Sequence, residues 1–339
     1  MSRPGLVAHA DWSASDAGRA VVLAEPGPGG RGWTLRLATA AALPELLATP
    51  GALVGFDAPL GLPRVYAGAR GIGSFRTFLA GLAPDDPFWT PVAPPALPSL
   101  ARPFYPARSG GARRALLEEG LGLGPFAAHL RQCDRLAAAN CLFWTLGPKQ
   151  CGRAALAIWR ELLRPALARV ALWPFDGSLP GLLGASRAVV AETYPGLAYR
   201  LLGLPRFAKS RPADRAARAG HLLALAETLA AGLDAELLDE ARAGFPVRRD
   251  HGFDALVGCL LLLQVVEGRR PAGDPVPGAA LPVEGWMIGL EVREPRARSA
   301  RSPAGQLTRC RCWASTSRVP AAAWEPPSGG ARSRSRPGS

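Results

Sequence analysis

The segment that most restricts the fold of this chain spans residues 51–63, where a short apolar run ends at an acid and a turn follows at once. Such a run is typical of a strand that is buried on both faces of a sheet. Pro59 cannot extend a ladder of hydrogen bonds and Gly61 favours a bend, so we expect Asp57 at the carboxyl end of a central strand. Ligands bind at that edge of open α/β sheets. The structural alternative is that Asp57 only caps the turn.

Two other segments of the chain repeat this pattern. Residues 6–11 and 187–192 are apolar runs that end at Asp11 and Glu192, and a turn follows each of them. If these strands belong to one sheet, the three carboxyl groups share a small volume. A further acid, Asp254, lies in an otherwise apolar helix, where an unpaired carboxylate is costly.

These acids favour a site for a divalent cation, because several ionised carboxylates at one place repel one another. Carboxylate oxygens suit Mg²⁺ or Mn²⁺, and few nitrogen or sulfur ligands lie nearby in the sequence to favour zinc. Two such ions roughly 3.5–4 Å apart activate a water molecule and stabilise the leaving oxygen of a phosphodiester. Each acid also has a structural explanation on its own. Asp11 can cap a turn, Glu192 can pair with an arginine, and Asp250 fits the N-cap of the last helix.

The order of the predicted elements indicates an α/β fold with a mixed five-stranded sheet flanked by helices. Three antiparallel strands, a short helix and a parallel strand come first. A large insertion of helices and loops, residues 64–185, separates the fourth strand from the fifth. The predicted strands are residues 6–11, 19–24, 32–37, 53–57 and 187–192. The predicted helices are residues 43–47, 131–140, 152–163, 197–202, 213–229, 235–243 and 250–266.

The formal charge of +13 at pH 7 comes mostly from the end of the chain. Residues 292–339 hold ten arginines and two glutamates, which leaves +5 for residues 1–291. This tail is rich in Arg, Ser and Pro and has no apolar periodicity, so we expect it to be disordered. We therefore expect one folded domain over residues 1–291, whose modest charge gives little support to a long groove for nucleic acid.

The sequence indicates a reduced cytoplasmic protein. Residues 1–11 lack the apolar stretch of a signal peptide. The longest apolar run, residues 255–266, is far shorter than the roughly 20 residues that span a bilayer, so no membrane is expected as a partner. The six cysteines show neither a C-x-x-C pair nor a matching histidine spacing. Nothing in the sequence indicates an oligomeric state.

Four basic residues are candidates for contacts with substrate phosphates. The chain has 38 arginines but only two lysines, Lys149 and Lys209, so both are candidates for a specific role, with chance retention as the alternative. Lys149 follows a Gly-Pro pair directly before a predicted helix, a position suited to an anion. Arg108 and Arg113 flank a glycine-rich turn and can clamp a phosphate, although a solvated loop explains them equally well.

Five short motifs of the chain are similar to those of a known family. They are Ala10-Asp11-Trp12-Ser13, Gly55-Phe56-Asp57-Ala58-Pro59-Leu60-Gly61-Leu62-Pro63, Glu192-Thr193-Tyr194-Pro195, residues 250–255 and Glu284-Gly285-Trp286. In these motifs the chain resembles the DUF429 family of predicted ribonuclease H-like nucleases, with coverage of about residues 5–290. The family name itself records an unknown function.

The resemblance implies a ribonuclease H-like fold and a metal-dependent nuclease, a hydrolase that acts on a nucleic acid or nucleotide. Its implied metal ligands are Asp11, Asp57 and Asp254, with Glu192 as a further catalytic acid. Ribonuclease H sites usually also have an acid on the first helix, and Glu45 is the only candidate there.

Three functions remain open at this point. The first is hydrolysis of a phosphodiester with two metal ions. The second is binding of a nucleotide or phosphorylated metabolite, as in actin-like members of the ribonuclease H-like superfamily. The third is a degenerate, non-catalytic binding module. The sequence does not distinguish DNA, RNA and small nucleotides as substrates.

Overall fold

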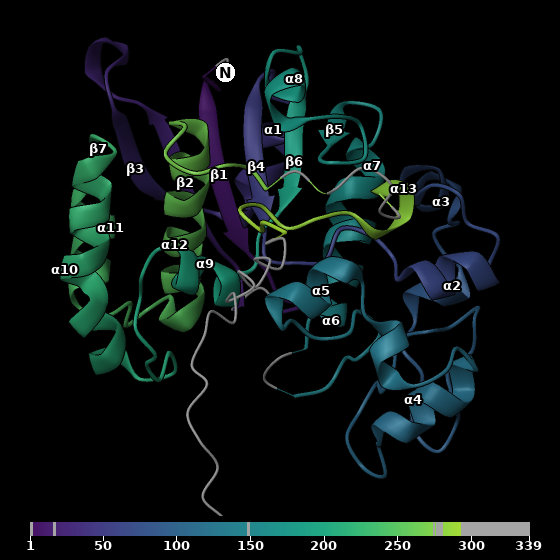
Figure 1. Ribbon diagram of the computed structural model, residues 1–339. Coiled ribbons are helices and arrows are strands. Elements are labelled where there is room, and N and C mark those ends of the chain that lie inside the picture. The colour runs from purple at the N-terminus through teal and green to yellow at the C-terminus, as the bar shows by residue number, and fades with distance from the viewer. Residues whose placement is uncertain (1–2, 16–17, 148–149, 274, 276–280, 293–339) are drawn as a thin grey trace, which may run out of the picture. The chain divides into compact units, whose positions relative to one another are not determined.

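A seven-stranded mixed sheet forms the centre of the computed structural model, which describes residues 3–15, 18–147, 150–273, 275 and 281–292 (Figure 1). The strand order is β5-β6-β4-β1-β2-β3-β7. The strands β1 to β3 are antiparallel, β4, β6 and β5 continue parallel to β1 on one side, and β7 pairs parallel to β3. The strands are β1 (Leu6–Asp11), β2 (Ala20–Pro26), β3 (Trp33–Ala38), β4 (Ala52–Phe56), β5 (Val170–Leu172), β6 (Ala188–Glu192) and β7 (Ala231–Leu233).

All five predicted strands are present, but the sheet has two more than the sequence indicated. Both additional strands, β5 and β7, have only three residues and form the two edges of the sheet. Three residues are too few to show an alternating pattern, which is why neither was predicted. The segment 64–185 therefore adds the edge strand β5 to its helices and loops.

Thirteen α-helices are found among the described residues, and they include a counterpart of every predicted one. They are α1 (Leu43–Leu46), α2 (Arg64–Ala69), α3 (Phe75–Gly81), α4 (Arg114–Leu121), α5 (Gln132–Ala137), α6 (Gly152–Ile158), α7 (Arg164–Ala166), α8 (Leu179–Leu183), α9 (Pro195–Leu201), α10 (Pro212–Thr228), α11 (Ala235–Arg242), α12 (Arg249–Val266) and α13 (Leu281–Glu284). Among these residues, none of the helices is long and apolar enough to cross a membrane.

Two of the differences between the predicted and the observed helix ends have a clear structural cause. Pro165 does not end the helix that starts at Gly152, because a π-helical turn over Trp159–Leu163 carries the chain into α7, which contains this proline. Asp250 is not the N-cap of α12, since the helix begins at Arg249 and Asp250 lies within its first turn. The predicted disorder of residues 292–339 concerns a segment of which only residue 292 is described.

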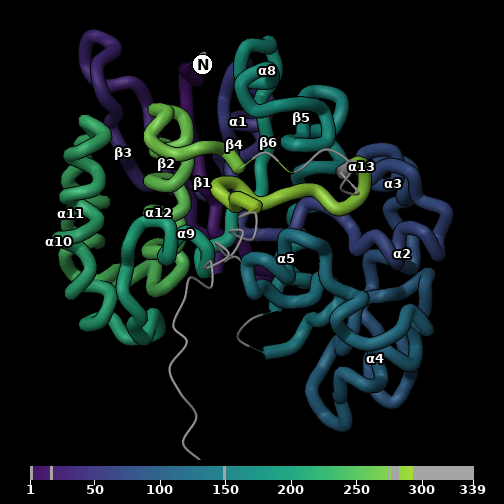
Figure 2. Tube along the Cα trace, in the orientation of Figure 1, coloured from purple at the N-terminus to yellow at the C-terminus, as the bar shows by residue number. Residues whose placement is uncertain are grey.

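The two faces of the sheet carry separate hydrophobic cores, because successive side chains of a strand point to opposite faces. Val7 and Leu53 pack with α9, α10, α11 and α12. Their neighbours Ala8 and Val54 pack with α1, α2, α3, α4 and α6. The tube drawing separates these two groups of helices clearly (Figure 2).

The helix α12 approaches β1 so closely that a glycine is required at their contact. A Cβ atom placed on Gly258 would lie 2.3 Å from the ring of His9, well inside van der Waals distance. His9 is fully buried, and its Nε2 forms a 2.5 Å hydrogen bond with Thr193 Oγ1. Burial lowers the pKa of His9 to about 3, so the ring is neutral. The close contact brings the residues one turn before Gly258 to the end of β1.

We predict that Gly258→Ala destabilises the protein by about 1–3 kcal/mol, the usual cost of forcing an extra carbon into a filled core. Gly220→Ala is the matched control, because Gly220 is exposed on α10 and has no atom within 4 Å of a built Cβ. It should instead stabilise the protein by about 0.5–1 kcal/mol through helix propensity. Urea unfolding measures both, and equal effects of the two changes would contradict the packing described for α12.

Candidate active site

Asp11 and Asp57 lie side by side at the carboxyl edge of the sheet. In the parallel pair β1–β4, Ala10 is opposite Phe56, and the amide of Asp57 donates a 3.0 Å hydrogen bond to the Ala10 carbonyl. The residues that follow this pair, Asp11 and Asp57, therefore point their side chains to the same face of the sheet, the face that α12 covers. The carboxyl groups of Asp11 and Asp57 lie close enough for each to affect the pKa of the other. The structure thus brings together the two acids of the first and fourth strands.

The helix α12 adds two polar side chains to this pair. Asp254 is 1% exposed, and its Oδ2 accepts a 2.7 Å hydrogen bond from Lys209 Nζ. Its Oδ1 accepts a hydrogen bond from the Tyr199 hydroxyl. His251, one turn earlier, places Nδ1 2.5 Å from Asp11 Oδ2. The close contact of α12 with β1 is what puts these groups against the strand end.

The electrostatics of this cluster are dominated by excess negative charge. Burial raises the pKa of Asp11 and of Asp57 well above their usual range, and the charge of Asp254 raises both further. Partial burial alone would lower the pKa of Lys209, but the nearby carboxylates more than offset it and raise that pKa. The ammonium group therefore stays charged, and Asp250 lies 3.6 Å from it. Four carboxyl groups, those of Asp11, Asp57, Asp250 and Asp254, surround one lysine. Protons or a cation must balance the negative charge that Lys209 leaves.

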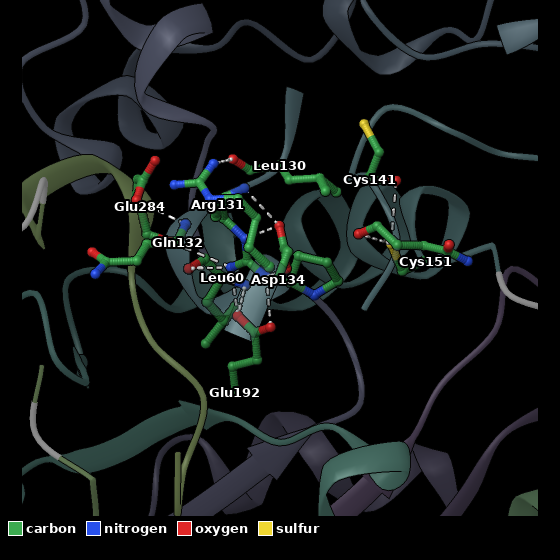
Figure 3. A network of polar contacts seen from close by, with 12 residues as sticks. Leu60, Leu130, Arg131, Gln132, Asp134, Cys141, Cys151, Glu192 and Glu284 are labelled. Carbon is green, nitrogen blue, oxygen red and sulfur yellow. Dashed lines mark hydrogen bonds and ion pairs between the residues drawn. The ribbon is translucent and has the colours of Figure 1, made fainter. Parts of the chain in front are cut away.

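Glu192 belongs to a different cluster, on the opposite face of the sheet. Glu192 is paired with Phe56, and paired residues of parallel strands point to the same face. Asp57 follows Phe56 directly, so its side chain points to the other face. The two carboxylate oxygens of Glu192 each accept a 2.7 Å hydrogen bond from Arg131. The Leu60 amide donates a third bond of 2.7 Å (Figure 3). Burial raises the pKa of Glu192 to about 7, and Arg131 acts in the opposite direction.

Arg131 is fully buried, and all three nitrogen atoms of its guanidinium group donate hydrogen bonds. Besides Glu192 it binds Asp134 through two bonds of 2.7 and 3.0 Å, and it donates to the carbonyl oxygens of Leu60 and Glu284 (Figure 3). It connects the ends of β4 and β6 with α5 and α13. The turn that follows Asp57 is held in place by this arginine.

A cavity of about 230 Å³ lies between the two clusters. Asp57 and Lys209 line it from the side of the first cluster, and Arg131 and Glu192 from the side of the second. Its wall also contains Trp12, which is 5% exposed. The indole N–H of Trp12 is buried and has no hydrogen-bond partner among the residues that the structure describes. A buried donor without a partner is costly in free energy.

Three further candidates from the sequence, Arg108, Arg113 and Glu45, do not lie at this cavity. Arg108 and Arg113 are exposed in the loop before α4, and neither lines the cavity. Lys149 is outside the described residues. Glu45 is exposed on α1.

Three contributors to the two clusters were missed in the sequence. His251 precedes Asp254 by three residues, which places both on one face of a helix, so its position was readable. For Tyr199 and Arg131 no local pattern indicates that they reach Asp254 and Glu192. Both contacts depend on tertiary structure.

Two carboxylates of this site could hold a divalent cation. Mg²⁺ commonly takes one or two protein carboxylates together with water and substrate oxygens. Asp11 and Asp57 supply such a pair, and Asp57 also faces the cavity. Both oxygens of Asp254 already accept hydrogen bonds. Within the described ranges, no group of three or more His, Cys, Asp or Glu side chains is arranged to enclose a metal ion.

Comparison with protein families agrees with the motifs noted above. The sequence model of the family described as "Protein of unknown function (DUF429)" matches residues 10–278, which include both clusters. The chain belongs to the DUF429 family. No curated protein and no solved structure matched the chain. The description of the DUF429 family states no activity, so function has to be argued from the site.

We predict that Arg131→Met destabilises the protein by about 3–5 kcal/mol, because it leaves Glu192 and Asp134 buried without their counter-charge. Arg36→Met is the matched control. Arg36 pairs with Glu25 across two strands at 3.1 Å, but both side chains are more than 40% exposed. Its loss should cost about 0–1 kcal/mol. Comparable losses in urea unfolding would contradict a structural role for Arg131.

We also predict that the metal-free protein becomes less stable as pH rises from about 6.5, where the opposing contribution of the neutral His9 ends, to about 8. The pKa of Asp11 and of Asp57 is raised in the folded state, so the folded chain holds protons that the unfolded chain has released. Stability from these groups is present at low pH and is lost as pH rises through the raised pKa. Glu192 adds a further loss of stability with rising pH, between its usual pKa of 4.5 and its folded-state pKa of about 7.

Melting temperatures measured with a chelator across this pH range test the prediction. Asp57→Asn removes one of the acids and should flatten the curve, whereas the change of an exposed acid, Asp85→Asn, should leave it as in the original protein. A melting temperature that rises with pH would contradict the assigned protonation.

Proposed function

We propose that this DUF429 protein is a Mg²⁺- or Mn²⁺-dependent hydrolase that cleaves a phosphate ester or phosphodiester on a ribonuclease H-like fold. The observation that carries the proposal is the carboxyl pair Asp11–Asp57 at the sheet edge, in which Asp11 is buried and the half-buried Asp57 lines a cavity. Such a pair concentrates negative charge where the fold leaves space for a ligand.

The topology of the sheet supports the fold assignment. Three antiparallel strands, β1 to β3, come first, and the parallel strands β4 and β6 follow next to β1. This order is expected for a ribonuclease H-like domain, and the acids stand at the carboxyl ends of its two central strands, where that class of enzyme binds metal.

Asp11 and Asp57 would hold the cation, which when bound would act as a Lewis acid on a phosphoryl oxygen. Lys209 lines the same cavity, and its ammonium group can attract the negative charge of a phosphate. His251 contacts Asp11 through Nδ1, so the ring orientation is set by the carboxylate.

The size of the cavity favours a small substrate. A volume of about 230 Å³ is below the roughly 300–1,000 Å³ of typical ligand pockets. Residues 1–291 carry a net charge of only +5, which is modest for a surface that follows a long polyanion. We therefore favour a nucleotide-sized phosphate ester or a short diester over a long nucleic acid as the substrate.

A second candidate function is binding of a phosphorylated ligand without catalysis. The observation that favours it is the partial neutralisation of the acids by the protein itself. Both oxygens of Asp254 are occupied by Tyr199 and Lys209, and Asp11 is bound by His251. In that case a ligand would bind in the cavity but no bond would be cleaved.

We predict that Mn²⁺ or Mg²⁺ raises the melting temperature of the protein and that Asp57→Asn abolishes the gain. The substitution keeps the side-chain size but removes the charge that would hold the cation. Asp85→Asn, at an exposed position, is the control and should retain the full gain. Thermal unfolding with and without the metal ion measures this directly.

Activity is tested with Mn²⁺ on bis(p-nitrophenyl) phosphate, mononucleotides, dinucleotides, single strands, duplexes and RNA–DNA hybrids. The small esters should be cleaved. Residues that only orient a ligand typically change activity by about 10–100-fold, and Asp57→Asn should lower the rate of cleavage by more than that. Metal-induced stabilisation without cleavage of any of these would favour the non-catalytic function. If the metal ion does not change the melting temperature, the proposal of a metal-dependent hydrolase is wrong.

A further inference from the structure

We infer that Lys209 occupies the position of a second cation, so that the acidic cluster takes a single divalent ion rather than two. This inference rests on the proposed function and deepens it, because it assigns the metal stoichiometry of the same site. It replaces the two-ion arrangement expected from the sequence by one divalent ion and one built-in ammonium group.

The position of Lys209 supports this role. Its Nζ lies 2.7 Å from Asp254 Oδ2 and 3.6 Å from Asp250 Oδ2. These two acids are one turn apart on α12, so the ammonium group lies against both of them as a bridging cation would. Lys209 comes from the connection between α9 and α10, a separate element that approaches α12 from the side of the cavity.

A second divalent ion would lack ligands while Lys209 is in place. Both oxygens of Asp254 already accept hydrogen bonds, one from Tyr199 and one from Lys209. To bind an ion, Asp254 would have to release the ammonium group, whose positive charge would also repel the ion. At the other pair, His251 contacts only Oδ2 of Asp11, and Asp57 lies beside Asp11 and lines the cavity. One ion at this pair therefore satisfies the ligands that remain.

The kind of residue fits the position as well. The chain has 38 arginines and two lysines, and here the compact ammonium group stands instead of a guanidinium. The ammonium group of a lysine is a compact charge with three donors and can lie between several oxygens. The planar guanidinium of an arginine is better suited to bind one carboxylate through two parallel hydrogen bonds. Asp254 is 1% exposed but the Lys209 side chain is 44% exposed, so Lys209 can be substituted without opening the core.

The inference is tested by counting bound Mn²⁺, using calorimetric titration and electron paramagnetic resonance of the free ion. The full chain should bind one Mn²⁺. Lys209→Met removes the charge at similar length and should bind two, and Lys209→Arg keeps a positive charge and should bind one. The melting temperature gives an independent readout. Mn²⁺ should raise it more in Lys209→Met than in the original protein, because the second ion replaces the lost ammonium group.

The outcomes separate the inference from the proposed function. Two ions in the original protein, or one in both it and Lys209→Met, would overturn the inference and leave the metal-dependent hydrolase in place. No ion in the original protein would overturn both. A Lys209→Met chain that stays unfolded even in Mn²⁺ also counts against the inference, because a divalent ion should be able to take the place of the ammonium group.

Discussion

The contact between α12 and β1 determines where the polar residues of this protein meet. Gly258 allows the helix to lie directly on His9, and a side chain at that position would push the two elements apart. Because the helix is rigid, its preceding turn then comes against the end of the strand, where Asp254 and His251 reach the level of Asp11. A separation larger by the width of one methyl group would leave Asp254 buried without these neighbours. The packing of a hydrophobic helix thus sets the geometry of a charged site.

The two ionic clusters at the sheet edge differ in charge balance, and this difference separates a structural role from a chemical one. Around Arg131 every donor is matched by an acceptor, so this cluster gains nothing from a ligand and acts to fix the turn behind Asp57. Around Asp57 the acids outnumber the cations, and one wall of that cluster faces a cavity. Buried charge without a partner is costly in free energy, so only the cluster around Asp57 has a reason to bind something from solution.

The fold could be predicted from the sequence wherever a strand was long enough to show a pattern. The central strands are apolar runs of five or six residues with a clear end, whereas β5 and β7 are too short to be distinguished from loops. The positions of Asp11 and Asp57 at strand ends follow from the same pattern. Their shared face depends on register, which hydrophobic runs on doubly buried strands do not reveal.

The role of Glu192 shows why register matters for the site. Its strand ends in an acid just as β1 and β4 do, but the pairing with Phe56 shifts it by one residue and turns it to the other face. A shift of one residue in a strand moves every side chain to the opposite side. Nothing near Glu192 in the sequence indicates Arg131 as its partner, because the two are joined only by the folded chain. Local patterns therefore placed the acids at the edge but did not divide them into two clusters.

The distribution of the first cluster along the chain has a consequence for how the protein is made. Asp11 and Asp57 belong to the strands that are synthesised first, while Lys209 and Asp254 come from the last third of the folded chain. Contacts between such distant segments form late and slow folding. A nascent chain that has reached β6 has its central strands but lacks the ammonium group and the helix that complete the charge pattern. The chain must extend through α12 before the acid pair of its first strands has its counter-charge.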